Sequence, residues 1–155
     1  MKTTIQIKSI FGKLLFKYEK EDNSIKDSLI EAIKRGAYLR GADLKRIATL
    51  NSILPEGELI VWKKLSEKLL AKLTIPAKAK RVNAIGSRKC RFEFAKVEAI
   101  YDGKKKVKEG FGQHDSLFIY KVGEIVKPDN FDPDPLVECS NGIHAFITKL
   151  EAQEY

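Results

Sequence analysis

The sequence has 155 residues, of which 43% are hydrophobic and 32% are charged. This is the composition of a globular protein, and it excludes the disordered and collagen-like classes. Every apolar run is shorter than the roughly 18 residues that a membrane span needs, and the N-terminal segment lacks the unbroken apolar stretch of a signal peptide. The isolated Cys90 and Cys139, without a CxxC motif, favour a reducing, cytoplasmic compartment, with a single disulfide between them as the alternative.

The net charge of +8 is distributed unevenly along the chain. Basic residues dominate between Val61 and Lys108, whereas acidic residues outnumber basic ones after Lys108. Such asymmetry predicts a polyanionic or acidic partner for the middle segment. The alternative is that the basic strands and the acidic C-terminal region face each other across one fold, or are merely solvated, because charge alone is a weak indicator of nucleic-acid binding.

The first predicted elements are a β-hairpin and a helix. Hydrophobic alternation over residues 3–18, interrupted by a turn at Gly12, predicts the hairpin. Ser24 and Asp27 form a variant of the capping box, apolar residues follow at helical spacing, and Gly36 suits a left-handed C-cap. We therefore predict a helix between Ser24 and Gly36.

Small residues and leucines then recur with a period of five over residues 37–46. Ala37 and Ala42 are the small positions, and Leu39 and Leu44 follow them two residues later. This segment resembles the pentapeptide repeat, whose right-handed coil points such residues inward. Two units are too few to bury the faces of a stack, so we expect a vestigial coil or a short connecting helix.

The remainder predicts an antiparallel sheet and a terminal helix. Apolar runs predict strands at residues 58–64, 69–75, 90–101, 117–122 and 142–147, and a basic loop is expected at residues 77–89. Asp102-Gly103 is a strong hairpin signal, and Thr148 with Glu151 forms a capping box that opens the helix. In the strand at 90–101 the apolar positions change phase, which indicates a β-bulge or a strand covered on both faces.

Together these elements predict an α+β fold: an N-terminal β-hairpin plus helix, then a mainly antiparallel sheet domain with a C-terminal helix. The domain boundary is expected between Asn51 and Pro55. This gives an N-terminal hairpin-helix domain with vestigial pentapeptide units at residues 1–52 and an antiparallel α+β domain at residues 53–155.

Three further stretches, at residues 80–91, 120–124 and 138–146, extend the pentapeptide resemblance. With them, nearly the whole chain resembles a family of phage and prophage proteins in which a hairpin and a helix precede pentapeptide units and an uncharacterised C-terminal domain. The resemblance implies a phage-encoded protein that acts inside a bacterial host. It implies no particular activity.

The segment from Gly142 to Phe146 carries a second resemblance. It is similar to the strand of ADP-ribosyltransferases that precedes a helix and stacks an aromatic residue on nicotinamide. The resemblance implies that His144 takes the place of that aromatic residue and that Lys63 stands where such enzymes carry an Arg-Gly or His-Gly pair. No acidic residue matches the catalytic glutamate. The alternative is a buried edge of an antiparallel sheet.

No P-loop, GxGxxG, HExxH or GxSxG motif occurs, so we predict no catalytic residue, no metal site and no cofactor. Arginine and lysine make charge-assisted contacts with carboxylate or phosphate, so the expected binding surface is basic. Its residues are Lys78, Lys80, Arg81, Arg88, Lys89, Arg91, Lys104, Lys105 and Lys106. Phe92 and Phe94 share a face that would suit base stacking, but phenylalanine is so often buried that a place in the core is the favoured interpretation. Cys139 and His144 are close enough in sequence to touch, although an isolated cysteine is more often a small buried hydrophobe.

The leading functional hypothesis is a phage-encoded, non-enzymatic accessory protein in the cytoplasm of the bacterial host. It would bind and inhibit or modulate a host protein or nucleoprotein machine, in counter-defence like an anti-CRISPR protein. The incomplete catalytic set favours binding over turnover. The alternatives are a nucleic-acid-binding module and a divergent ADP-ribosyltransferase-like enzyme. No membrane partner is expected.

Overall fold

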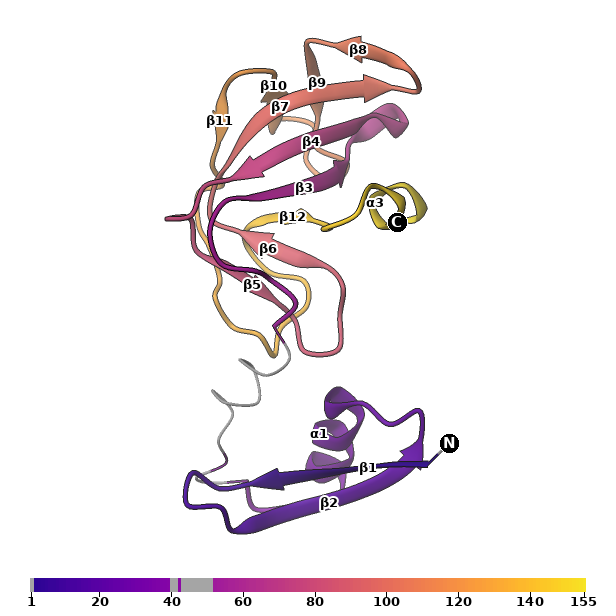
Figure 1. Ribbon diagram of the computed structural model, residues 1–155, viewed down its shortest axis with the longest axis vertical. Helices are drawn as coiled ribbons and strands as arrows, with labels where there is room; N and C mark the ends of the chain where they lie inside the picture. Colours follow the sequence, from indigo (N-terminus) through magenta and orange to yellow (C-terminus); the bar gives the residue numbers. More distant parts are fainter. Residues whose placement is uncertain (1, 40–41, 43–51) are drawn as a thin grey trace. The chain divides into compact units, whose positions relative to one another are not determined.

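The computed structural model in Figure 1 describes residues 2–39, 42 and 52–155. The chain divides into two compact units, residues 1–52 and residues 53–155. Every strand pair in the described residues is antiparallel and the helices are short, which confirms the broad α+β class. None of the helices in the described part of the chain is long and apolar enough to cross a membrane.

In the first unit, two antiparallel strands pack with one helix. Strand β1 (Lys2–Lys8) pairs with β2 (Leu14–Glu21), and α1 (Ile25–Lys34) follows. A small buried cluster of Ile7, Leu29 and Ala32 joins the helix to the strands. The backbone N–H of Asp27 donates to Ser24 Oγ at 3.0 Å, which satisfies one free donor at the start of α1.

The predicted pentapeptide segment lies largely outside the described residues. Of its members, the structure describes Ala37, Tyr38, Leu39 and Ala42. Ala37, Leu39 and Ala42 are partly buried against the cluster around Ile7. The prediction of a coil at residues 40–41 and 43–46 therefore stays a prediction.

The second unit contains three small antiparallel sheets and a C-terminal helix (Figure 1). Its strands are β3 (Leu59–Lys64), β4 (Leu70–Ile75), β5 (Arg81–Asn83), β6 (Cys90–Phe92), β7 (Ala95–Asp102), β8 (Lys105–Val107), β9 (Glu109–Phe111), β10 (Ile119–Lys121), β11 (Ile125–Val126) and β12 (Ile143–Ala145). A short 3-10 helix, η1 (Ser66–Lys68), joins β3 to β4, and α3 (Lys149–Glu154) ends the chain. The largest sheet has the order β11-β7-β4-β3 with β8 added to β7, the second has the order β12-β6-β5, and the third is β9-β10.

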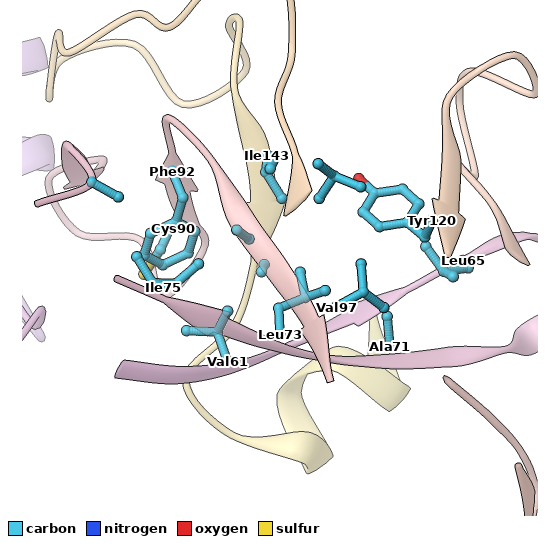
Figure 2. Packing of buried hydrophobic residues seen from close by; sticks show 14 of the residues in the cluster. Val61, Leu65, Ala71, Leu73, Ile75, Cys90, Phe92, Val97, Tyr120 and Ile143 are labelled. Atoms are coloured by element: carbon cyan, nitrogen blue, oxygen red, sulfur yellow. The ribbon is translucent and has the colours of Figure 1, made fainter. Parts of the chain in front are cut away.

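One hydrophobic core joins these sheets. Val61, Leu73 and Val97 lie in register on β3, β4 and β7, and all three are fully buried. They belong to the same buried cluster as Phe92 from β6 and Ile143 from β12 (Figure 2). Alternate residues of a regular strand point to one face, and in this way the period of two in the sequence supplies residues to the core.

The predicted strand at 90–101 is in fact two strands. The chain leaves β6 after Phe92, passes through Glu93 and Phe94, and enters β7 at Ala95 in a different sheet. The phase change between Phe94 and Ala95 therefore marks a switch between sheets. The stretch also contains an irregularity of the kind predicted, because the pairing of β4 with β7 shifts register between Lys72 and Leu73, opposite Ala99 and Val97. The interpretation of Phe92 and Phe94 as core residues is confirmed: Phe92 is fully buried, and Phe94 packs against the same cluster, which leaves no exposed base-stacking face at Phe92.

Local turn and cap signals agree with the structure. Asp102 pairs with Lys105 across the β7–β8 turn, where Gly103 has a φ of 58°. At α3, Thr148 and Glu151 form both hydrogen bonds of a capping box. The basic stretch at 77–89, predicted as a loop, contains the short strand β5.

The two larger sheets are joined beside β12. The backbones of Trp62 on β3 and Phe146, just after β12, exchange two hydrogen bonds of 2.7 and 2.8 Å. This bridge carries β12 and then α3 alongside β3 (Figure 1). It brings the next residue of β3, Lys63, close to His144.

Candidate functional site

A cavity of about 420 Å³ opens where β3, β10 and β12 meet the loops at residues 112–118, 128–130 and 140–142. Its lining includes Lys63, His114, Asp115, Tyr120, Asn141 and His144. The strands supply the inner residues Lys63, Tyr120 and His144, whereas His114, Asp115 and Asn141 are exposed at the loops. A concave site of this size, with converging polar groups, is the usual setting for a ligand.

Lys63 is a cation enclosed in this cavity. Its Nζ donates to the backbone carbonyl of His144 at 3.0 Å and lies 5.9 Å from the centre of the Tyr120 ring. Burial, together with the positive charge of Lys89, lowers the pKa of Lys63 to about 8. Burial lowers a lysine pKa because the charged form loses its hydration.

His144 is the second polar group on the inner wall. Its Nε2 is buried and makes no hydrogen bond in the described structure. Burial, with the charges of Lys89 and Lys63, lowers the pKa of His144 to about 4, although a backbone hydrogen bond with Ser140 opposes the shift. The imidazole is therefore neutral at pH 7, and its buried Nε2 has no hydrogen-bond partner among the described residues.

Two further cations lie close to His144. Arg91 pairs with His144 in the β6–β12 register, so the two side chains share one face of that sheet. Arg91 is only 2% exposed, and its guanidinium donates to the backbone carbonyls of Asp134 and Val137. Lys89 is 8% exposed.

Neutral partners hold Lys89 in place. Its Nζ donates to the Tyr155 hydroxyl at 2.7 Å and to Cys139 Sγ at 3.4 Å, and it lies 4.8 Å from the centre of the Tyr155 ring. Burial opposes the charge of Lys89, but the hydrogen bonds to Tyr155 and Cys139 outweigh it and raise the lysine pKa. Lys89 is therefore a permanent cation near the cavity.

Within the described residues, neither Lys63, Lys89 nor Arg91 forms an ion pair with a carboxylate. Enclosed charges in proteins are normally paired, because each loses hydration on burial. All three cations act on His144 and lower its pKa. Carboxylates lie on the loops: Asp115 and Asp129 line the cavity, and Asp132 interacts electrostatically with Arg91. The positive charge is therefore concentrated around Lys63 and His144 on the inner wall.

The structure separates the nine residues predicted to bind a partner. Lys78, Lys80, Arg88, Lys104, Lys105 and Lys106 are exposed. Arg88 is paired with Glu151 at 2.5 Å. Lys89 and Arg91 are buried, so the expectation that they belong to one exposed basic surface is wrong.

Arg81 forms hydrogen bonds within the second unit. Its guanidinium donates to the backbone carbonyls of Pro55, Pro76 and Ala79 at 3.1, 2.8 and 3.4 Å. These carbonyls lie before β3 and between β4 and β5. The binding role of the six exposed residues stays a prediction, whereas Arg81, Lys89 and Arg91 have internal partners.

Sequence reasoning found His144 but not the cavity. In the sequence Lys63 stands out only as a departure from the ADP-ribosyltransferase resemblance. The sequence does contain a signal for this site, namely Lys63 within the mainly apolar strand Leu59–Lys64. A charge in a buried strand is unfavourable unless it is paired or hydrogen-bonded. Cys90 and Cys139 are both free thiols, and no group of three metal-binding side chains occurs within the described ranges.

The second unit is thus an antiparallel α+β domain with an open cavity whose inner wall carries Lys63 and His144. Residues 50–152 match the model of a family described as a family of unknown function, DUF5758, and the chain belongs to this family. No curated protein matches the sequence, and no solved structure matches the fold.

Proposed function

We propose that residues 53–155 bind an anionic group, a phosphate or carboxylate, in the cavity between Lys63 and His144. Through this site the protein acts as a phage-encoded, non-enzymatic accessory protein. It binds a host protein or nucleoprotein machine in the bacterial cytoplasm and modulates it in counter-defence. The observation that carries the proposal is the enclosed ammonium of Lys63, which has a backbone carbonyl but no carboxylate as its partner.

Electrostatics supports an anion rather than a cation or a neutral ligand. Two unit charges 4 Å apart attract by roughly 4 kcal/mol at the effective dielectric constant of about 20 that suits sites near a protein surface. Lys89 and Arg91 add to the potential, since both act on His144. The carboxylates of Asp115 and Asp129, on the loops that line the cavity, accept hydrogen bonds, so they favour a ligand that carries hydrogen-bond donors beside its anionic group.

The biological setting follows from the resemblance to phage proteins rather than from the cavity. A binding protein needs no complete catalytic set. The inner wall offers Lys63, Tyr120 and His144, and the carboxylate of Asp115 on the neighbouring loop acts on Tyr120. Tyr120 is buried, which raises its pKa, so it stays a neutral phenol. The site therefore offers charge and hydrogen-bond donors to a ligand, which supports recognition of an anionic group.

Calorimetric titration with inorganic pyrophosphate and with citrate tests the anion site. We expect binding by the wild type and a loss of at least about tenfold in Lys63→Met, because one charge-assisted contact disappears. Lys121→Met, on the exposed face of β10 and outside the cavity lining, should bind like the wild type. Equal binding by the wild type and Lys63→Met, or no binding of either anion, would contradict the proposal.

One observation favours a second candidate, the divergent ADP-ribosyltransferase-like enzyme. The two residues that occupy its motif positions, Lys63 and His144, are 81 positions apart and line the same cavity. NAD carries a pyrophosphate, so it also fits a cationic site. Incubation of the protein with labelled NAD and host lysate should then label a macromolecule, and His144→Ala should abolish the label. A blank, with no NAD binding in the calorimeter, removes this candidate.

A further inference from the structure

We infer that Lys63 is a nucleophilic amine that forms an imine with an anionic ligand carrying an aldehyde. The inference rests on the proposed anion site, because the anionic group would hold the aldehyde near the lysine. It adds a covalent step to that site.

The position of Lys63 is the first support. Its side chain lines the cavity, and its Nζ donates to a single acceptor, the carbonyl of His144. An ammonium has three N–H donors and an amine has two, so at least one is left for a ligand. No described carboxylate holds a proton on Nζ. Lysines enclosed in this way are the ones that serve as Schiff-base residues.

The groups around Lys63 favour the neutral amine. Lys89 repels its charge, His144 is neutral at pH 7, and Tyr120 remains a protonated phenol. With a pKa of about 8, roughly a quarter of Lys63 is an amine at pH 7.5, against about a thousandth for an ordinary lysine. The other titratable groups lining the cavity are His114, Asp115 and Asp129.

The reaction balances without a further reagent. The amine nitrogen of Lys63 attacks the carbonyl carbon, the electron pair of the C=O bond moves to oxygen, and a proton passes through solvent from the nitrogen to that oxygen. The resulting carbinolamine then loses its hydroxyl group together with the remaining proton of the nitrogen as water, and the nitrogen electron pair forms the C=N bond. One amine and one aldehyde give one imine and one water, and nothing is oxidised or reduced.

Pyridoxal 5′-phosphate is the probe, because it combines an aldehyde with a phosphate. The full chain is incubated with the probe, the imine is reduced with borohydride, and the modified lysine is located by peptide mass spectrometry. We expect Lys63 to be the main site, with a pH profile of labelling whose midpoint lies near 8. Labelling spread over the exposed lysines, or a midpoint near 10 at Lys63, would overturn the inference.

Lys64 provides the matched control. It is the next residue on β3, and its Nζ likewise donates to one backbone carbonyl, that of Gln153, at 3.0 Å, but it does not line the cavity. Lys64→Met should keep the label on Lys63. Lys63→Arg keeps the positive charge but has no amine, so we expect it to retain anion binding and to lose the label. Circular dichroism of each variant checks that it is folded.

Pyridoxine 5′-phosphate separates the two proposals, because an alcohol replaces its aldehyde. If pyridoxine phosphate binds in a Lys63-dependent manner but pyridoxal phosphate leaves no covalent mark on Lys63, the imine is overturned and the anion site stands. If neither compound binds, both proposals fail. Selective reduction onto Lys63, together with binding of the alcohol, supports both.

Discussion

Lys63 shows how one enclosed charge couples the cavity to the stability of the fold. In the unfolded chain its pKa returns toward the ordinary value of 10.5, whereas in the folded chain it is about 8. Between these values the unfolded state binds more protons than the folded state. Stability therefore rises with pH across this range, and the destabilisation is fully present below pH 8.

Lys63→Met should remove this pH dependence. We expect its free energy of unfolding to exceed that of the wild type at pH 7 by up to about 2–3 kcal/mol and to converge on it toward pH 10.5. Urea denaturation at pH 7, 8, 9 and 10 measures the difference, and Lys64→Met is the control. Parallel curves for Lys63→Met and the wild type would show that Lys63 keeps an ordinary pKa in the fold.

At the scale of elements, Arg81 and Arg88 have opposite roles although they are close in sequence. Arg81 connects the segment before β3 to the β4–β5 connection through three backbone carbonyls. Arg88 makes an exposed pair with Glu151 in α3, and this hydrogen bond raises the Arg88 pKa. The Arg81 hydrogen bonds thus connect separate segments of the second unit, whereas the Arg88–Glu151 ion pair is exposed to solvent.

We therefore predict that Arg81→Ala lowers the free energy of unfolding by about 1.5–3 kcal/mol, because three carbonyls lose charge-assisted donors. Arg88→Ala should change it by less than about 1 kcal/mol, as is usual for an exposed pair. Chemical denaturation of both variants provides the test. A neutral effect of Arg81→Ala would mean that solvent replaces its hydrogen bonds, and Arg81 would again be a candidate for partner contact.

At the scale of the whole molecule, the basic charge divides into an enclosed and an exposed part. Lys63, Lys89 and Arg91 surround His144, whereas Lys104, Lys105 and Lys106 are exposed around the β7–β8 turn. Only the exposed lysines at the β7–β8 turn can contact the backbone of an extended polyanion. The nucleic-acid alternative therefore depends on the β7–β8 turn and not on the cavity.

If this turn binds nucleic acid, the affinity for a single-stranded oligonucleotide should fall steeply with salt, because bound phosphates release counterions. Reversing Lys104, Lys105 and Lys106 to Glu should reduce the slope of log K against log salt by about 2, at roughly 0.7 per phosphate contact. Fluorescence anisotropy at several salt concentrations measures both slopes.

A matched control reverses Lys8, Lys13 and Lys17, which are exposed lysines of the first unit. It changes the net charge by the same amount at a different place. An equal loss of slope in the two triple variants would show a general effect of net charge. An unchanged slope in the variant at Lys104–Lys106 would show that these lysines are only solvated.

The sequence by itself determined the features that depend on neighbouring residues. The mixed, mainly antiparallel class, the strands near Leu59–Lys64 and Leu70–Ile75, the Asp102-Gly103 turn and the Thr148–Glu151 cap all follow from local patterns. Alternation specifies that a strand has two faces, and a capping box needs only four successive residues. These signals are sufficient because their partners are close in the chain.

The tertiary structure alone decided which strands pair and which charges are enclosed. A period of two in the sequence does not say which sheet a strand joins, so the change of sheet between Phe92 and Ala95 was not predictable. The burial of Arg91 depends on carbonyls more than 40 residues away. Lys63 and His144 meet because the backbones of Trp62 and Phe146 pair across the molecule. Such long-range pairing arises from packing of the whole domain, and it is this packing that builds the cavity.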